Sequence, residues 1–205
     1  KRRGCTVNKE LREKIVEDMK QRLSAKRFKH VLAVADAAVK LAHHYGQNEE
    51  KAELAGLLHD AAKEESLKCM QDSARILYGS TLDDEVMQRP ELLHGYAAAA
   101  YASLTYNVFD NDVLRAIAYH TTGHIEMSPL EKIIFLADYI EVNRDFPEAE
   151  ELRKTAFIDL DRAVLMGYDT TLAYLIKQEK AIYTGTVANR NALLAEVKKA
   201  DGVYR

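Results

Sequence analysis

The chain has 205 residues, of which 47% are hydrophobic, so it can bury a substantial core without disulfide bonds or a structural metal. Its 29 basic and 32 acidic residues give a formal net charge of −3. This balance gives no sign of the basic excess that is typical of nucleic-acid-binding proteins. The length predicts one domain over residues 1–205, with a core at about 20–180.

The two cysteines, Cys5 and Cys69, are far apart and neither belongs to a C-x-x-C pair, so we expect free thiols rather than a disulfide framework. No apolar run approaches the roughly 20 residues that a membrane span requires. No secretory signal pattern opens the chain. We therefore expect a cytoplasmic protein with neither a membrane nor a nucleic acid as partner.

Near the start of the chain, hydrophobic residues recur every four positions, at Leu11, Ile15, Met19 and Leu23. This spacing predicts a helix with one buried face. The same stripe would also serve as the seam of a homodimer, but we favour burial in the core of a single chain.

Two more helices are predicted next. The first runs from Lys26 to Gly46, a residue type that commonly follows a helix. Asn48 then predicts the N-cap of a helix that contains "AELAGLLHD". A short helix near residues 67–77 and a looser stretch, "YGSTLDDEVMQRPELLHG", follow.

The second half of the chain is also predicted to be helical. "YAAAAYASLTY" and "DVLRAIAYH" form two helices, and "SPLE" begins another, with Ser128 as N-cap, Pro129 at the first position and Glu131 completing a capping box. A long amphipathic helix is predicted from about 151 to 180. "YTGTVANRN", residues 183–191, is predicted to be a loop and "ALLAEVKKA" a last short helix, so that about 181–205 forms a C-terminal appendage. The fold class is therefore all-α.

Four polar residues lie where apolar ones are expected. His30 shares a helical face with Val34 and Leu41 and so points inward, as a hydrogen-bonded core histidine would. His59 and Asp60 interrupt the apolar run "AGLLHDAAKE", unless a helix ends there in solvent.

Asp138 lies in "IIFLADYI", in line with the apolar positions Leu130 and Ile134. A lone carboxylate on that face would be costly to bury unless it caps another helix. One shared metal would explain all four polar residues, because two imidazoles and two carboxylates from three helices form a ligand set for a divalent transition metal. These predicted ligands are His30, His59, Asp60 and Asp138. The cation would neutralise the carboxylates and give each imidazole a partner.

The pattern H…HD…D resembles that of the HD-domain metal phosphohydrolases. Longer segments, "AGLLHDAAKE", "LLHGYAAA", "AIAYHTTGHIEMSPLEKIIFLADYIEVNRDFP" and "TVANRN", are similar to the bacterial YqeK type, the symmetrical diadenosine tetraphosphate hydrolases. The resemblance covers roughly residues 20–195. It implies an all-helical HD-domain bundle and cleavage of diadenosine tetraphosphate at its centre into two ADP. It also implies a bound iron ion, with manganese, cobalt or nickel as alternatives.

Three cations suit a polyphosphate substrate. Arg27 precedes His30 by three residues and Lys63 follows Asp60 by three, so helical spacing would place each beside the metal face. Arginine offers a bidentate fork to phosphate and lysine a point charge. Arg144, six residues after Asp138, is the third candidate. Solvated surface charge is the alternative for all three.

His94 and His120 extend the pattern to H…HD…H…H…D, which also fits a site with two metals. The resemblance instead implies that both histidines face the phosphates beside a single metal. Thr121 and Thr186 are weaker candidates for contacts with phosphate or ribose. We expect the remaining histidines, His43, His44 and His124, to be structural or exposed.

As catalytic residues we expect Asp60, Lys63, His94 and His120. Asp60 would hold the attacking water, and the other three would stabilise phosphate charge or protonate the leaving oxygen. One alternative is an HD phosphohydrolase for another nucleotide, namely a nucleotidase or an enzyme for guanosine tetraphosphate or a cyclic dinucleotide. Another is a non-catalytic module that senses nucleotides.

Overall fold

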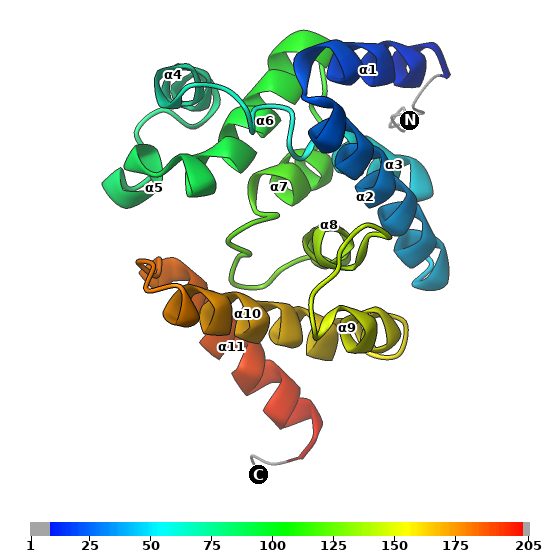
Figure 1. Cartoon of the computed structure of the whole chain (residues 1–205), viewed down its shortest axis with the longest axis vertical. Coiled ribbons are helices and arrows are strands. Elements are labelled where there is room, and N and C mark those ends of the chain that lie inside the picture. The colour runs from blue at the N-terminus through cyan, green and yellow to red at the C-terminus, as the bar shows by residue number, and fades with distance from the viewer. Residues whose placement is uncertain (1–8, 203–205) are drawn as a thin grey trace.

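The structure is a computed structural model that describes residues 9–202, and within this range all regular secondary structure is helical (Figure 1). The all-α prediction is therefore confirmed, whereas Cys5 lies outside the described residues. None of the helices in this range combines the length and apolarity that a membrane span requires. The described helices are α1 (Lys9–Arg22), α2 (Ala25–His44), α3 (Glu49–Leu58), α4 (Leu67–Tyr78), α5 (Asp84–Gln88), α6 (Pro90–Tyr106), α7 (Asn111–Ala118), α8 (Pro129–Ile140), α9 (Ala149–Ala156), α10 (Leu160–Lys177) and α11 (Thr184–Ala200).

The apolar stripe of α1 packs against the rest of the chain. Ile15, Met19 and Leu23 are buried in the hydrophobic core, and Leu11 packs against its edge. Helix α1 contacts α2 and α3. The predicted burial of this stripe in the core is confirmed.

Helices α2 and α3 form the closest helix pair around the predicted metal ligands. A Cβ added to Gly56 in α3 would lie 2.7 Å from Cα of Ala35 in α2, a distance that real Cβ atoms do not reach. Glycine therefore lets the two backbones approach closely. This approach places the end of α3, where His59 follows, against the face of α2 that carries His30.

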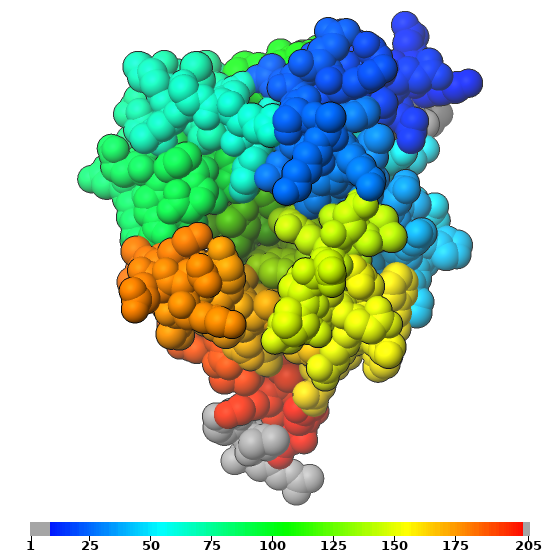
Figure 2. Space-filling view, in the orientation of Figure 1, coloured from blue at the N-terminus to red at the C-terminus, as the bar shows by residue number. Residues whose placement is uncertain are grey.

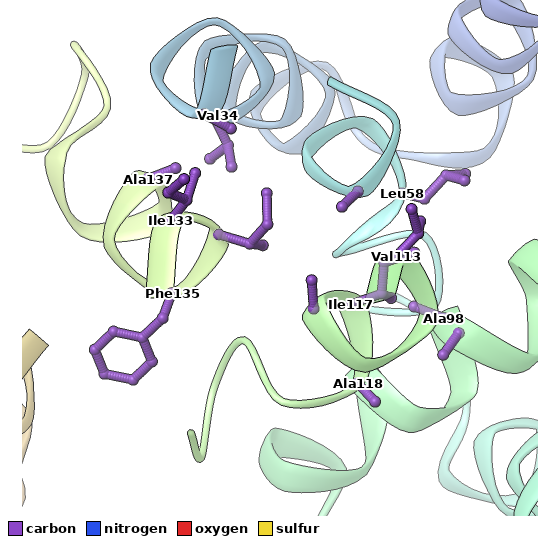
Figure 3. Close-up of a cluster of buried hydrophobic side chains, with 14 of the residues drawn as sticks. Val34, Leu58, Ala98, Val113, Ile117, Ala118, Ile133, Phe135 and Ala137 are labelled. Atoms are coloured by element: carbon purple, nitrogen blue, oxygen red, sulfur yellow. The ribbon is translucent and has the colours of Figure 1, made fainter. Parts of the chain in front are cut away.

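Helix α8 lies in the middle of the molecule and packs on α2, α3, α7 and α10 (Figure 1). In Figure 3, Val34 of α2 faces Ile133 of α8, while Leu58 of α3 lies near Ile117 of α7. Phe135 points to the opposite side of α8, where α10 packs. The core thus fixes α2, the end of α3, α7 and α8 relative to one another.

The predicted start of α8 is confirmed in detail. The Ser128 side chain accepts a hydrogen bond from the Glu131 N–H, and the Glu131 carboxylate accepts one from the Ser128 N–H, which completes the capping box. Pro129 occupies the first helical position, where its missing N–H has no intrahelical partner to lose.

The single long helix predicted for about 151–180 is wrong, because the structure has two helices there. Helix α9 ends at Ala156 and α10 begins at Leu160. Asp159 caps α10, with its side chain accepting a hydrogen bond from the Arg162 N–H. The amphipathic pattern continues across this break and so conceals it.

The loop predicted for residues 183–191 is also wrong, because α11 begins at Thr184 and continues to Ala200. Tertiary contacts stabilise this helix despite its glycine, threonine and asparagine residues. Asn189 donates a hydrogen bond to the Thr122 carbonyl, and Arg190 donates one to Asp169 on α10. Leu193 is buried in the core. Local composition indicated a loop, but these contacts outweigh it.

Candidate metal centre

The structure brings together the four predicted metal ligands from three parts of the chain. His30 is on α2, His59 and Asp60 directly follow α3, and Asp138 is on α8. His30 Nε2 lies 3.1 Å from Asp138 Oδ1 and 3.7 Å from Asp60 Oδ2, and His59 Nε2 lies 3.5 Å from that same Asp60 oxygen. His59 and Asp60 are 0% and 2% exposed, respectively. The four side chains therefore meet at one buried point.

This donor set fits a divalent cation. Among the described residues, Nε2 of His30 and Nε2 of His59 are buried without a hydrogen-bond partner. A buried polar atom without a partner is costly, and an imidazole Nε2 is a common ligand of divalent metals. Donor atoms of His30, His59 and Asp138 all lie within 4.8 Å of one another, as do those of His59, Asp60 and His120.

Hydrogen bonds on the far side of each ring hold the two imidazoles in this orientation. His59 Nδ1 donates to the Gly56 carbonyl at 2.7 Å, and His30 Nδ1 donates to Glu141 Oε1 at 3.2 Å. Both bonds leave Nε2 as the free ligand atom. Glu141 was missed in the sequence, although its position three residues after Asp138 places it one helical turn along the same face.

Both carboxylates of the cluster are ionised. Burial raises the pKa of Asp60, but the imidazoles of His59, His120 and His94 around its carboxylate outweigh burial and hold that pKa well below its usual value. Burial likewise raises the pKa of Asp138, and the adjacent His30 imidazole is the largest of the effects that lower it well below the usual range. Two negative charges thus face the orphaned imidazole nitrogens.

His94 and His120 form the other wall of the cluster. Their Nε2 atoms are 3.0 Å apart and lie 3.3 and 3.6 Å from Asp60 Oδ1. His94 Nδ1 donates to the Pro90 carbonyl, and His120 Nδ1 donates to the Ile117 carbonyl. His94 lies inside α6 rather than in the looser stretch that the sequence predicted. Both rings are buried and rigidly oriented toward Asp60.

Lys63 and Thr121 lie on the same side of Asp60 as His94 and His120. Burial lowers the pKa of His94 to about 4, so its imidazole is neutral near pH 7. Lys63 Nζ donates to His94 Nε2 at 3.1 Å. The Thr121 hydroxyl lies 3.2 Å from that nitrogen and 3.1 Å from His120 Nε2. A cation, a hydroxyl and two histidines therefore converge on one side of Asp60.

The two arginines lie on the opposite side of the cluster. Arg27 Nη1 donates to Asp60 Oδ2 at 2.8 Å. Arg144 donates through Nε to the Asp138 carbonyl at 2.7 Å and through Nη2 to the Asp138 carboxylate. Both guanidinium groups contact predicted metal ligands, so all three cations border the same site.

A glycine is required where α6 meets the end of α7. A Cβ on Gly95 would lie 2.6 Å from the Ala118 carbonyl oxygen and 3.2 Å from His120 Nδ1. Real Cβ atoms do not come as close as 2.6 Å to a carbonyl oxygen, so Gly95 permits the approach that places His94 beside His120.

The remaining candidates lie apart from these contacts. Thr186 is buried in the first turn of α11, and within residues 9–202 no hydrogen bond joins it to the cluster. His124 lies near Arg115, and His43 is exposed beside Glu49. For His43 and His124 these positions agree with the structural or exposed roles expected from the sequence.

Comparisons with known proteins place this geometry in a family. Residues 27–143 match the HD domain, a domain that binds divalent metals. The structure of a chain described as a predicted HD superfamily hydrolase involved in NAD metabolism from Clostridium acetobutylicum is similar, with a TM-score of 0.85 and 41% sequence identity. The match covers 90% of this chain and 97% of that one.

Curated bacterial relatives extend over most of the chain. A protein of Halalkalibacterium halodurans named symmetrical bis(5'-nucleosyl)-tetraphosphatase is 41% identical over 91% of this chain and 99% of its own length. Proteins of the same name from Bacillus subtilis and Staphylococcus aureus are 34% and 37% identical, over 90% and 85% of this chain and 98% and 90% of their own lengths. The chain therefore belongs to the HD-domain family, among relatives of the symmetrical bis(5'-nucleosyl)-tetraphosphatase type.

Proposed function

We propose that the chain is a metal-dependent hydrolase that splits diadenosine tetraphosphate symmetrically into two ADP. The observation that carries this proposal is the convergence of two orphaned imidazole nitrogens and two ionised carboxylates beside three cations. A metal site bordered by cations suits a substrate made mostly of phosphate. Relatives that carry the name of this activity share 34–41% of the sequence over most of the chain.

His30, His59, Asp60 and Asp138 are the proposed metal ligands, and iron is the proposed ion, with manganese, cobalt or nickel as alternatives. When bound, the metal supplies a Lewis acid that polarises a phosphoryl oxygen and lowers the pKa of water. Glu141 keeps the His30 ring in its binding orientation through the hydrogen bond to Nδ1.

The other residues bind and orient the phosphates. Asp60, whose second oxygen faces His94 and His120, is proposed to hold the attacking water by accepting a hydrogen bond from it. Lys63 stabilises charge on the phosphate and leaving oxygens from the same side, with His94 fixing the position of its ammonium group. His120 and Thr121 lie next to this position and face the same phosphates.

Arg27 and Arg144 are proposed to bind phosphate oxygens on the opposite side, since each already contacts a carboxylate of the cluster. Thr186, at the start of α11, is proposed to contact the ribose or phosphate of one ADP half.

Nucleotide hydrolysis of this kind fits the cytoplasm, which we propose as the location of the protein.

Substitution of one ligand tests the metal assignment. We expect Asp138→Ala to lose bound metal and turnover together, because it removes one of two carboxylates, while circular dichroism shows unchanged helicity. Asp72→Ala, which removes an exposed carboxylate on α4, is the matched control and should behave as the parent. Full activity in Asp138→Ala would refute the metal site.

The alternative substrates are tested in the same preparation. Nucleoside monophosphates, guanosine tetraphosphate and cyclic dinucleotides should be turned over far more slowly than diadenosine tetraphosphate. Faster hydrolysis of any of them would replace the proposed substrate while leaving the metal site in place.

A further inference from the structure

A cleft of about 720 Å³ opens between helix α10 and the segment that follows α8. Figure 2 shows this hollow between α10, in orange, and the residues after α8, in yellow-green. At one end the cleft is lined by Asp138 and Arg144, which belong to the metal cluster. Its volume lies within the range of pockets that bind small molecules. The cleft is therefore a continuation of the candidate metal centre.

We propose that this cleft binds the second nucleoside of the dinucleotide, an inference that rests on the proposed function. Diadenosine tetraphosphate carries a nucleoside at each end of its phosphate chain. When an inner phosphorus lies at the metal, the two nucleosides must leave the site in two different directions. One binding site for a nucleoside is then not enough.

The cluster itself separates these two directions. Lys63, His94, His120 and Thr121 border Asp60 on the side formed by the end of α3, α6 and α7. That side receives the first ADP half. Asp138 borders the cluster on the α8 side, and the cleft begins at its carboxylate. A phosphate chain that crosses the metal from Asp60 to Asp138 therefore enters the cleft.

The lining of the cleft suits a nucleotide. Aromatic rings come from three segments, namely Tyr139 on α8, Phe146 after it and Tyr174 on α10. Aromatic side chains provide stacking surfaces for bases of any identity. Arg144 and Lys177 line the cleft and supply positive charge for phosphate. Glu148 and Asp169 also line it, and Asp169 is paired with Arg190.

Tyr174 is the residue whose substitution separates this role from a structural one. Its side chain is 52% exposed although it lines the cleft, so the core does not depend on it. Lys180 lies over its ring at 5.1 Å and donates a hydrogen bond to its hydroxyl. Removal of the Tyr174 ring therefore changes the cleft without opening a cavity in the core.

The test compares a substrate with two nucleosides and one with a single nucleoside, diadenosine tetraphosphate and adenosine tetraphosphate. We expect Tyr174→Ala to lower kcat/KM for the dinucleotide about tenfold through a higher KM, because one base loses its stacking surface. Turnover of adenosine tetraphosphate, whose base can bind at the first site, should not change. Tyr174→Phe keeps the ring and should behave as the parent.

Ile176→Ala is the matched control, because Ile176 lies on the same helix and is 66% exposed but does not line the cleft. An equal loss with both substrates in Tyr174→Ala, or no loss with either, would overturn the cleft assignment. The parent protein's release of ADP from the dinucleotide is measured first, and its failure would refute the proposed function instead. In that case the cleft assignment is tested by calorimetric binding of the dinucleotide to the metal-free parent and to metal-free Tyr174→Ala. About tenfold weaker binding to the variant is expected. Equal binding to both proteins would contradict the assignment.

Discussion

Both ring nitrogens of His30 face residues that lie more than a hundred positions later in the sequence. Its Nδ1 bonds Glu141 and its Nε2 faces Asp138. Asp138 lies in the last turn of α8, and Glu141 directly follows that helix. Glu141 is buried, and its other oxygen accepts hydrogen bonds from the Asn143 backbone and side chain. The carboxylate is thus fixed and can hold the imidazole in place for a metal.

We expect Glu141→Ala to weaken metal binding about 10- to 100-fold without unfolding the protein, because it removes the group that orients a ligand. Metal retained after dialysis against graded chelator concentrations measures this loss. Glu150→Ala, at an exposed carboxylate on α9, is the control and should retain metal as the parent does. Equal metal retention in Glu141→Ala and the parent would show that His30 needs no such partner.

Lys63 is predicted to act on the phosphates rather than to serve as surface charge. Its ammonium group contacts a buried, neutral histidine beside Asp60. We expect Lys63→Ala to lower kcat/KM about 10²-fold, the usual effect of removing one donor that stabilises developing negative charge. Lys68→Ala removes an exposed lysine that pairs with Asp72 and should have no effect. If Lys63→Ala turned over substrate at the parent's rate, Lys63 would be surface charge.

At the residue scale, the sequence predicted side chains whose polarity conflicts with their surroundings. His30, His59, Asp60 and Asp138 were identifiable because each interrupts an apolar pattern, and the structure places all four together. The pattern could not identify Glu141. An acidic residue near the end of a helix is common, and its partner lies 111 positions away in the sequence.

Close approach of helix pairs positions the two walls of the cluster. Gly56 brings α3 against α2, and Gly95 brings α6 against the end of α7. In both places a residue of the predicted site, His59 or His94, lies within a turn of the glycine. The spacing of these helices therefore determines the distances within the site.

We expect Gly95→Ala to lower the free energy of unfolding by about 1–3 kcal/mol, because a methyl group would overlap the Ala118 carbonyl oxygen. The same displacement should separate His94 from His120 and lower kcat. Denaturant unfolding and turnover are measured alongside Leu104→Ala, an exposed position on the same helix that should change neither. Parent-like stability and turnover in Gly95→Ala would show that this approach is not required.

The elements that the sequence predicted well are those whose ends are determined locally. The capping box of α8 involves Ser128 and Glu131, three positions apart, and it is present as predicted. The start of α11 depends instead on contacts such as that of Asn189 with Thr122, which only the folded chain provides. Such contacts cannot be predicted from the composition or periodicity of a helix.

For the whole molecule, the continuous hydrophobic core predicts that the metal is not needed for folding. Buried residues from α1 to α11 belong to this core. We expect the metal-free protein to keep its helicity and to unfold cooperatively while turnover is lost, as circular dichroism and thermal unfolding would show. Collapse of the helical signal on metal removal would indicate a structural metal and favour a sensing module.

The fold class could be predicted because helical periodicity extends along most of the chain, and the family because the segments that resemble it cover most of the chain; both predictions are confirmed. The cleft beside Asp138 could not, because it arises from how α10 and the segment after α8 are placed relative to each other. The roles of the individual site residues remain predictions that the variants above test.

The products formed from diadenosine tetraphosphate test the central claim most directly. Purified protein reconstituted with iron or manganese is incubated with the dinucleotide, and the products are separated by charge. Hydrolysis at the centre of the phosphate chain should yield ADP as the sole nucleotide product. ATP and AMP in equal amounts would contradict the account.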